Sequence, residues 1–547
     1  MTRFQTHVVE NQPPDFAPRD LWADDVALRE AIDREGGGAH VDRLARYGAL
    51  AGSELYALSF DAHRDKPRLR THDRFGHRID VVEFHPSYHR IIDAAIGHGV
   101  AGLSWAGQVS GAHVARAALS YLHHQVEPGT SCPLTMTHAA VPVLRHVPAL
   151  REWVEKVASS SYDPRDMPIA DKAGVTIGMG MTEKQGGSDV RSNMTTATPL
   201  ATGDTASGQE YALVGHKWFF SAPMSDGFLV LAQAPGGLTC FLLPRRLADG
   251  RKNAFALMRL KDKLGDWSNA SAEVEFMDAR ATRIGDEGRG VATILEMVML
   301  TRLDCMLGSV AEMRMALAQA LHHTAHRRAF GKALLEQLLM RNVLADLAIE
   351  WEAALALSMR VARAVDAMPR DPHEAALARV ATAIGKYWIC KRTPAFVNEA
   401  QECLGGAGYI EESILPRLYR QAPLNSIWEG SGNIQCLDVL RALTREPESG
   451  AVLMAELGAA TGMHTGYDAC FAALKAALVP QQLEEAGARL LVERLALALQ
   501  ASILLRAQSP VADAFCRSRL GGQRGLALGT LPTDLDFGAL IERVLPV

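Results

Sequence analysis

Residues 174–190, GVTIGMGMTEKQGGSDV, mark the point where one spacing of apolar residues ends and another begins. Upstream, from about 20 to 170, apolar residues recur with the period of a helix, as in HPSYHRIIDAAIGHG (85–99). From about 175 to 285 they stand in short runs rich in β-branched and aromatic residues, separated by turn residues. We therefore predict a helical N-terminal domain over residues 1–174 and an antiparallel β domain over residues 175–285.

Helical spacing returns after RIGDEGRG (283–290) and continues in long stretches. It predicts a helical bundle domain over residues 286–445. The segment TREPESG (444–450) indicates a boundary, and residues 446–547 read as a further helical extension. The predicted fold class is therefore α+β and mainly helical.

Composition narrows the class of protein. The chain has 547 residues, of which 48% are hydrophobic and 22% charged, and a net charge of -5 gives no general attraction to nucleic acid or anionic lipid. Eight dispersed cysteines without a CxxC pair favour thiols of a reducing cytosol over disulfides or zinc. Residues 94–115 lack charged side chains, but five glycines, two histidines and a glutamine predict a buried segment of a cytoplasmic protein and no membrane span.

Two motifs carry little functional information. GHGVAG (97–102) has the spacing of a dinucleotide fingerprint, yet it follows a helical pattern, and no acidic residue stands about 20 positions later. In LHHTAHRR (321–328), His322 and His326 share a helix face without an acidic ligand nearby, so we predict no metal site.

The loop MGMTEKQGGSDV (179–190) offers more chemistry. Its adjacent glycines, the hydroxyls of Thr182 and Ser188 and free backbone N–H groups can approach a flat polar ring or a pyrophosphate. A simple turn capped by Asp189 would have the same composition. The neighbouring run VGHKWFFSAP (214–223) adds aromatic rings and the hydroxyl of Ser221.

The segment SIWEGSGNI (426–434) places one carboxylate, Glu429, between bulky apolar residues and two glycines. This segment has two interpretations. Glu429 is either a base that removes a proton, or an acidic residue that complements the positive N-terminus of the next helix.

Five segments together resemble one known family. They are MTEKQGGSDV (181–190), HKWFFS (216–221), HRRAFGKALLEQ (326–337), CLGGAGYIEE (403–412) and SIWEGSGNIQ (426–435). They occur in the order seen in acyl-CoA dehydrogenases. The sequence resembles most the AidB branch of that superfamily, through THVVENQPP (6–14), SCPLTMTHAA (131–140) and LPRLYRQAPLNSIWEGSGNIQCLDVLRAL (415–443). The resemblance implies an N-terminal helical domain, a middle β domain, a four-helix bundle, bound FAD and a homotetramer.

The resemblance also implies roles for individual residues. Phe219 falls where the family stacks a Trp on the flavin, with Trp218 one position earlier, so either ring is a candidate. The family's Gln after "FG" is displaced to Gln337, and Glu402 stands where a Gln precedes the glycine pair. The implied cofactor-binding residues are Met179, Met181, Thr182, Gly187, Ser188, Trp218, Phe219, Ser221, Arg327, Phe330, Gly405, Gly406, Gly430, Ser431, Gly432 and Asn433.

The same resemblance places Glu429 at the base that removes the α-proton of an acyl-CoA thioester. The AidB branch implies weak activity on substrates of the isovaleryl-CoA type, a role in the response to DNA alkylation or in destroying alkylating compounds, and binding of double-stranded DNA. For DNA the resemblance implies Arg441, and FCRSRLGGQRG (515–525) adds a local cluster of arginines, Arg517, Arg519 and Arg524. Residues 446–547, however, hold eight Lys and Arg against eleven Asp and Glu, which opposes DNA binding. The alternative is a metabolic acyl-CoA dehydrogenase that passes electrons to an electron-transfer flavoprotein.

Overall fold

The computed structural model describes residues 6–107, 109–201, 207–478 and 483–545. The chain divides into two compact units. We call Gly37–Tyr47 with Glu54–Cys305 the sheet unit, and Met1–Gly36, Gly48–Ser53 and Met306–Val547 the bundle unit.

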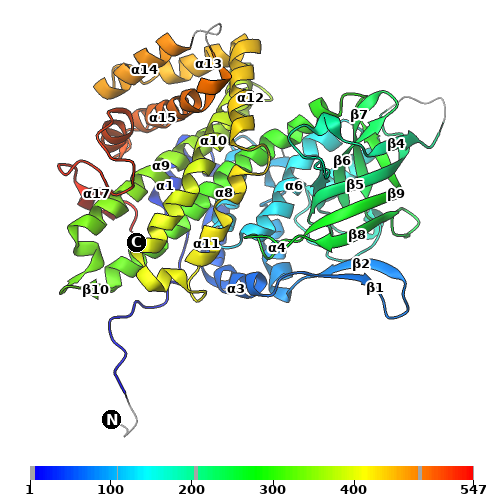
Figure 1. Ribbon diagram of the computed structural model, residues 1–547, viewed down its shortest axis with the longest axis horizontal. Helices are drawn as coiled ribbons and strands as arrows, with labels where there is room; N and C mark the ends of the chain where they lie inside the picture. Colours follow the sequence, from blue (N-terminus) through cyan, green and yellow to red (C-terminus); the bar gives the residue numbers. More distant parts are fainter. Residues whose placement is uncertain (1–5, 108, 202–206, 479–482, 546–547) are drawn as a thin grey trace. The chain divides into compact units, whose positions relative to one another are not determined.

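A seven-stranded sheet forms the middle of the sheet unit, in the order β3-β5-β4-β6-β7-β9-β8 (Figure 1). Additional pairings of β3 with β6 and of β5 with β9 curl this sheet back on itself. Antiparallel pairing dominates, as predicted, whereas β3 runs parallel to β6. The strands are β3 (Ile177–Gly180), β4 (Thr196–Pro199), β5 (Glu210–Ser221), β6 (Gly227–Ala234), β7 (Gly237–Pro244), β8 (Phe255–Leu260) and β9 (Ser271–Ile284).

Phenylalanine rings fill the interior of the curled sheet. Phe220 on β5 lies 4.3 Å from Phe228 on β6, centroid to centroid, and Phe255 and Phe276 pack edge-on around them. All four side chains are at most 2% exposed. Burial of this aromatic area is the main favourable contribution that holds the sheet closed.

A β-hairpin interrupts the helices that the sequence predicts before residue 174. It consists of β1 (Arg68–His72) and β2 (Arg78–Glu83). Its apolar residues alternate with polar ones, and Val82 and Leu69 pack on the hydrophobic cluster of the large sheet. The period-two pattern was therefore present in the sequence, but only the tertiary contact stabilises so short a pair of strands.

The remaining elements of the sheet unit are helices, as predicted. Helix α4 ends at Gly99, whose φ of 93° is left-handed, so GHGVAG closes a helix and does not begin a nucleotide-binding loop. The helices are α3 (Tyr56–Arg64), α4 (Pro86–His98), α5 (Ala112–His124), α6 (Pro128–Leu144) and α7 (Arg151–Val157), with α2 (Val41–Leu50) and α8 (Gly290–His326) shared between the units.

The bundle unit is almost entirely helical. Helix α10 packs along α9, and α15 packs against both, so the last hundred residues extend the bundle itself (Figure 1). Across the described ranges, every helix is too short or too polar to cross a membrane. The helices are α1 (Val26–Arg34), α9 (Leu338–Ala367), α10 (Pro372–Cys403), α11 (Leu415–Gln421), α12 (Gly432–Arg445), α13 (Pro447–Gly458), α14 (Thr465–Ala477), α15 (Ala488–Arg506), α16 (Ala512–Phe515) and α17 (Phe537–Glu542). A small hairpin, β10 (Arg328–Ala329) with β11 (Lys332–Ala333), follows α8.

Replacing Phe220 by Ala opens a cavity inside the sheet, and we expect the free energy of unfolding to fall by about 3–5 kcal/mol. Phe219, the adjacent residue, is 48% exposed and serves as the matched control. Urea denaturation of FAD-free protein measures both changes. Equal losses for Phe220→Ala and Phe219→Ala would contradict this description of the core.

Candidate functional site

The predicted flavin loop of the sheet unit begins where β3 ends. Met179 on β3 pairs with Ser221 on β5, and the N–H of Trp218 donates to the carbonyl of Thr182 over 2.8 Å. Another carbonyl of the loop, that of Met181, accepts from Asn193 Nδ2 over 2.9 Å. The structure thus brings the predicted strand and loop residues of this unit together at one end of the sheet.

Glycine is required where this loop folds onto Thr182. A Cβ on Gly187 would lie 2.4 Å from Thr182 Oγ1, closer than any real contact. Ser188 and the backbone on either side of it are exposed. The loop therefore presents hydroxyls and peptide groups without intervening side chains, which fits a flavin ring or a diphosphate.

A fully buried ion pair supports the loop from inside the sheet. Lys217 Nζ donates to Glu183 Oε1 over 2.8 Å, and both side chains are 0% exposed. Glu183 also accepts hydrogen bonds from the N–H groups of Met194 and Thr195. Burial alone would raise the pKa of Glu183, but the Lys217 ammonium and these hydrogen bonds lower it to about 2. Glu183, which follows Thr182 directly, is thereby an ionised anchor for the loop.

Two aromatic residues of β5, Trp218 and Phe219, are alternative candidates for the ring that lies beside a flavin. Lys261 Nζ lies 3.3 Å from the ring centroid of Trp218 and 4.8 Å from that of Phe219. Adjacent residues of a regular strand point to opposite faces, but the register of β5 shifts between Lys217 and Phe220, and both rings reach the same cation. Because Lys261 covers Trp218 more closely, Phe219 is the more open ring.

In the bundle unit, Glu429 lies on a short left-handed turn. Its φ is 57°, and that of Gly430 is 91°. Such a conformation is unfavourable for a residue with a Cβ and often marks a functional site. Glu429 is partly buried, and α12 begins three residues later with Ser431 as an N-cap that makes no side-chain capping bond. The first N–H groups of α12, at Gly432 and Asn433, are therefore suited to a phosphate group.

Arg327 and Phe330, two of the implied cofactor-binding residues, lie just after the end of α8. Phe330 is 98% exposed with a φ of 52°, at the tip of the β10–β11 hairpin. Arg327 donates to the carbonyl of Asn11 over 2.5 Å, and the Asn11 side chain bonds both backbone groups of Arg328. Asn11 could not be identified from the sequence, because the contact joins residues more than 300 positions apart.

The glycine pair after α10 is open to its surroundings. No atom of the described structure lies within 4 Å of a Cβ placed on Gly405 or Gly406, and Gly405 has a φ of 58°. Glu402 is exposed, whereas the neighbouring Gln401 is buried and donates to the carbonyl of Gly408 over 2.8 Å. An amide side chain therefore does support this loop, one position before the site expected from the resemblance.

The arginines predicted to bind DNA differ in what they contact. Arg519 is 0% exposed and pairs with Asp346 and Glu350 of α9, at 2.5 and 2.9 Å, so it is removed from any DNA-binding surface. Arg517 makes a bidentate contact with Asp534 at 2.8 Å. Arg524 is partly buried, and this burial lowers its pKa. Of these four arginines, only Arg441, on α12, is exposed.

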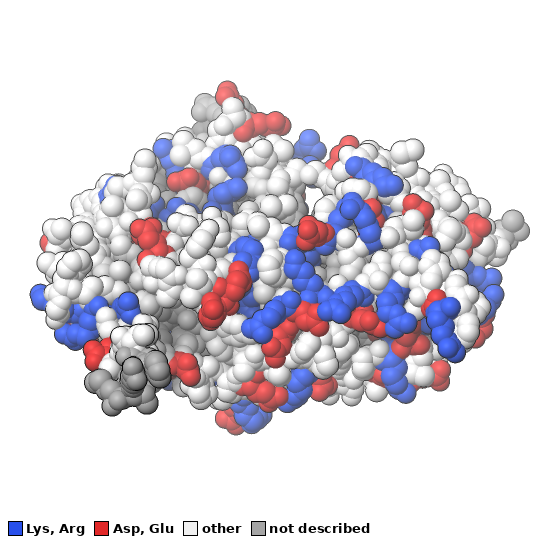
Figure 2. Space-filling view, turned by 60° about the horizontal axis from the view of Figure 1, so that its bottom comes forward, with Lys and Arg blue, Asp and Glu red and all other residues white. Residues whose placement is uncertain are grey.

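Charge on the surface is mixed in sign. Figure 2 shows Lys and Arg interspersed with Asp and Glu across the face that it presents. His322 and His326, whose rings lie 4.7 Å apart on α8, bond backbone carbonyls. Within the described residues, no group of three or more His, Cys, Asp or Glu could hold a metal ion, and all eight cysteines are free thiols.

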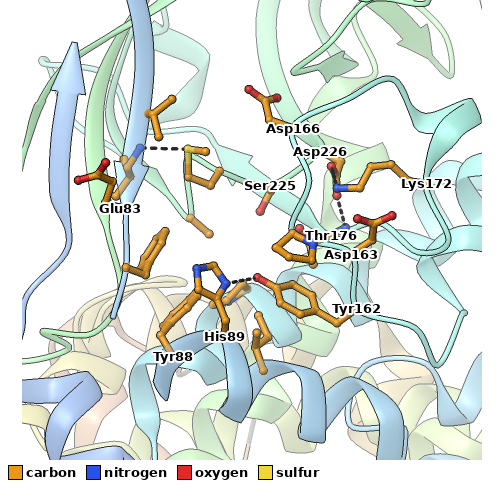
Figure 3. A pocket seen from close by; sticks show the side chains of 18 residues that line it. Glu83, Tyr88, His89, Tyr162, Asp163, Asp166, Lys172, Thr176, Ser225 and Asp226 are labelled. Carbon is orange, nitrogen blue, oxygen red and sulfur yellow. Dashed lines mark hydrogen bonds and ion pairs between the residues drawn. The ribbon is translucent and has the colours of Figure 1, made fainter. Parts of the chain in front are cut away.

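A cavity of about 370 Å³ lies inside the sheet unit, between α4, β2 and the turn after β5 (Figure 3). His89 Nδ1 contacts the Tyr162 hydroxyl at 2.9 Å, and Lys172 pairs with Asp226 at 2.5 Å. Burial lowers the pKa of His89. Ala222, which lines the cavity, follows Ser221 directly. Because Lys172 and Asp226 neutralise each other, the cavity suits an uncharged group.

Comparison with known proteins decides the family. Residues 11–164 match the adaptive response protein AidB N-terminal domain, residues 178–279 the acyl-CoA dehydrogenase middle domain, and residues 288–444 the acyl-CoA dehydrogenase C-terminal domain. The chain is 46% identical over 529 residues to the putative acyl-CoA dehydrogenase AidB of Escherichia coli strain K12, with 96% of both chains covered. The chain belongs to the AidB branch of the acyl-CoA dehydrogenase family.

Two further comparisons involve members of the acyl-CoA dehydrogenase family from Caenorhabditis elegans. Acyl-CoA dehydrogenase family member 11 is 32% identical over 416 residues, covering 73% of this chain and 66% of its own. The crystal structure of ACDH-11 in complex with C11-CoA superimposes with a TM-score of 0.85 at 26% identity, covering 95% of this chain and 94% of its own. The family assignment and the predicted mainly helical fold class are thus confirmed.

Replacing Lys217 by Met leaves the Glu183 carboxylate buried without its cation, and we expect a loss of about 3–5 kcal/mol in the free energy of unfolding at pH 7. In the wild type the pKa of Glu183 is lowered from 4.5 to about 2, so its contribution is complete above pH 4.5 and disappears as the pH falls through 2. In the variant only burial and the backbone hydrogen bonds act on Glu183, and protonation relieves the unpaired buried charge, so the stability difference from the wild type should shrink as the pH falls below about 4.5. Urea denaturation between pH 7 and pH 3 measures this.

The matched control is Lys184→Met, because Lys184 is exposed in the same loop. It should change stability by less than about 1 kcal/mol. Identical acid profiles for wild type and Lys217→Met would contradict the anchoring role of the pair.

Proposed function

We propose that the protein is an FAD-containing flavoprotein of the AidB type, with weak acyl-CoA dehydrogenase activity and a role in the response to DNA alkylation. The observation that carries the chemical part is Glu429. It is a carboxylate on a left-handed turn before the N-terminus of α12, at the position that the resemblance assigns to the family's base.

Each unit, taken by itself, has residues that fit part of FAD. In the sheet unit, Thr182, Gly187 and Ser188 would suit the ring or part of the diphosphate. In the bundle unit, Gly430, Ser431 and Gly432 at the start of α12 would suit a phosphate group. Phe219 and Trp218 are the candidates for stacking. When bound, FAD accepts the hydride that leaves the β-carbon of the acyl group.

The chain's own contribution is to move the α-proton. Glu429 takes this proton onto a carboxylate oxygen, which requires the carboxylate to point at the α-carbon. The indole of Trp428 bonds Asn425 Oδ1 over 2.9 Å, which fixes the apolar ring next to the base.

The substrate we propose is an acyl-CoA of the isovaleryl-CoA type. The complex of the nematode relative with C11-CoA supports a thioester ligand. The cavity that begins at Ala222 supports an uncharged acyl group near Ser221. The second candidate is a metabolic acyl-CoA dehydrogenase that transfers electrons to an electron-transfer flavoprotein, and the acidic C-terminal extension favours it.

Assembly and location also belong to this proposal. We propose a cytoplasmic homotetramer that binds duplex DNA. Phe330, Leu338 and Leu339 are 98, 76 and 84% exposed, and burying such side chains against another copy would be favourable. Arg441 is the best-placed of the four arginines for phosphate contacts.

Glu429→Gln keeps the size of the side chain and removes the base. We expect FAD content to stay the same and the rate of flavin reduction by isovaleryl-CoA to fall by at least about 100-fold. Anaerobic stopped-flow absorbance measures the rate. Reduction at the wild-type rate would exclude Glu429 as the base, and fast wild-type reduction without DNA affinity would favour the metabolic alternative.

Arg441→Ala should weaken duplex binding for all sequences and reduce the slope of log affinity against log salt by about 1. Arg519→Ala should instead lower the melting temperature and leave that slope unchanged, because its side chain is buried with Asp346 and Glu350. Fluorescence anisotropy with a labelled duplex at several salt concentrations tests both. A smaller slope for Arg519→Ala alone would contradict the assignment.

A further inference from the structure

Two buried side chains hold the backbone on which Glu429 stands. Lys386 of α10 is 1% exposed, and its Nζ donates to the carbonyls of Trp428 and Gly430 over 2.8 and 2.7 Å. Gln435 of α12 is 0% exposed, and its Nε2 donates to the carbonyls of Glu429 and Gly430 over 3.0 and 2.9 Å. Three successive carbonyls are therefore fixed by donors from two helices.

These bonds act on a backbone that is locally unfavourable. Glu429 and Gly430 are consecutive left-handed residues, with φ values of 57° and 91°. Glycine tolerates this region, but the Cβ of a glutamate does not, and such a residue persists only where its surroundings hold it. Because both the φ of Glu429 and the direction of its carbonyl are held, the direction of its Cα–Cβ bond is fixed as well.

A third contact fixes the residue before the base. The Trp428 indole donates to Asn425 Oδ1, and Asn425 Nδ2 donates to Ser309 Oγ of α8 over 3.2 Å. The turn is thus tied to α8, α10 and α12 within the bundle unit. If Glu429 only capped α12, its carboxylate oxygens would make the capping bonds, and the backbone carbonyls of the turn would not need these donors.

We propose that Lys386 and Gln435 are positioning residues that aim the Glu429 carboxylate at the α-carbon of the acyl-CoA; this rests on the proposed function. Neither side chain touches substrate. Lys386 suits the task because its charged ammonium donates to two carbonyls at once, and charge-assisted bonds are stronger than neutral ones. Loss of either donor frees a strained turn, and misplacing a base by about 1 Å can cost about 100-fold in rate.

The test compares Lys386→Met and Gln435→Met with Lys391→Met, an exposed lysine on the same helix. Hydrogen–deuterium exchange of residues 426–434, measured without FAD, reports the turn directly. Anaerobic flavin reduction by isovaleryl-CoA, and exchange of its α-hydrogen with D₂O, report the base. Combination with Glu429→Gln in a double-mutant cycle separates action through Glu429 from a general structural defect.

In Lys386→Met we expect faster amide exchange at residues 426–434 and about 100-fold slower α-hydrogen exchange, with unchanged FAD content. In Lys391→Met we expect both rates to stay unchanged. The double variant Lys386→Met with Glu429→Gln should be no slower than Glu429→Gln alone. Gln435→Met gives the same test if Lys386→Met does not fold.

Three results would overturn the proposal. Wild-type α-hydrogen exchange in both Lys386→Met and Gln435→Met, with Glu429→Gln slow, would remove the positioning role and leave the proposed function intact. Additional slowing in the double variant would show that Lys386 acts independently of the base. Wild-type flavin reduction in Glu429→Gln would overturn the proposed function itself, and the positioning role with it.

Discussion

A charge taken out of water must meet an opposite charge or several hydrogen bonds, and the candidate residues of each unit depend on this requirement. In the sheet unit, Lys217 and Glu183 satisfy each other inside the curled sheet, and the loop that carries Thr182 and Ser188 follows from their position. In the bundle unit, the ammonium of Lys386 is satisfied by two carbonyls of the turn that carries Glu429. Buried charges thus hold the loop and the turn in place, although a bound cofactor or substrate would not contact those charges.

The same requirement explains the C-terminal extension. The carboxylates Asp346 and Glu350 of α9 are buried, and Arg519 of the extension supplies the opposite charge. A related contact joins Arg543 to Glu352, also on α9. These arginines stabilise the bundle by joining segments far apart in the chain. Residues 446–547 have a net negative charge, and some of their arginines are buried in ion pairs. The number of arginines is therefore a poor guide to DNA binding here.

The proposed role of Glu429 demands a fixed direction, because a base must point at the carbon that loses the proton. The structure supplies the direction through a strained turn held by three helices.

The sequence alone determined the fold class, the family and the loops that carry the candidate chemistry, because the helical and alternating patterns are long and the five motifs are local. It did not determine the β1–β2 hairpin, whose strands are stabilised only by packing on the large sheet. Nor could it identify Asn11 or Lys386, or distinguish buried Arg519 from exposed Arg441. A lone lysine in the apolar run ATAIGKYWIC (381–390) was the only available signal for Lys386. Each of these depends on which distant carbonyl or carboxylate a side chain meets, and that is decided only when the chain has folded.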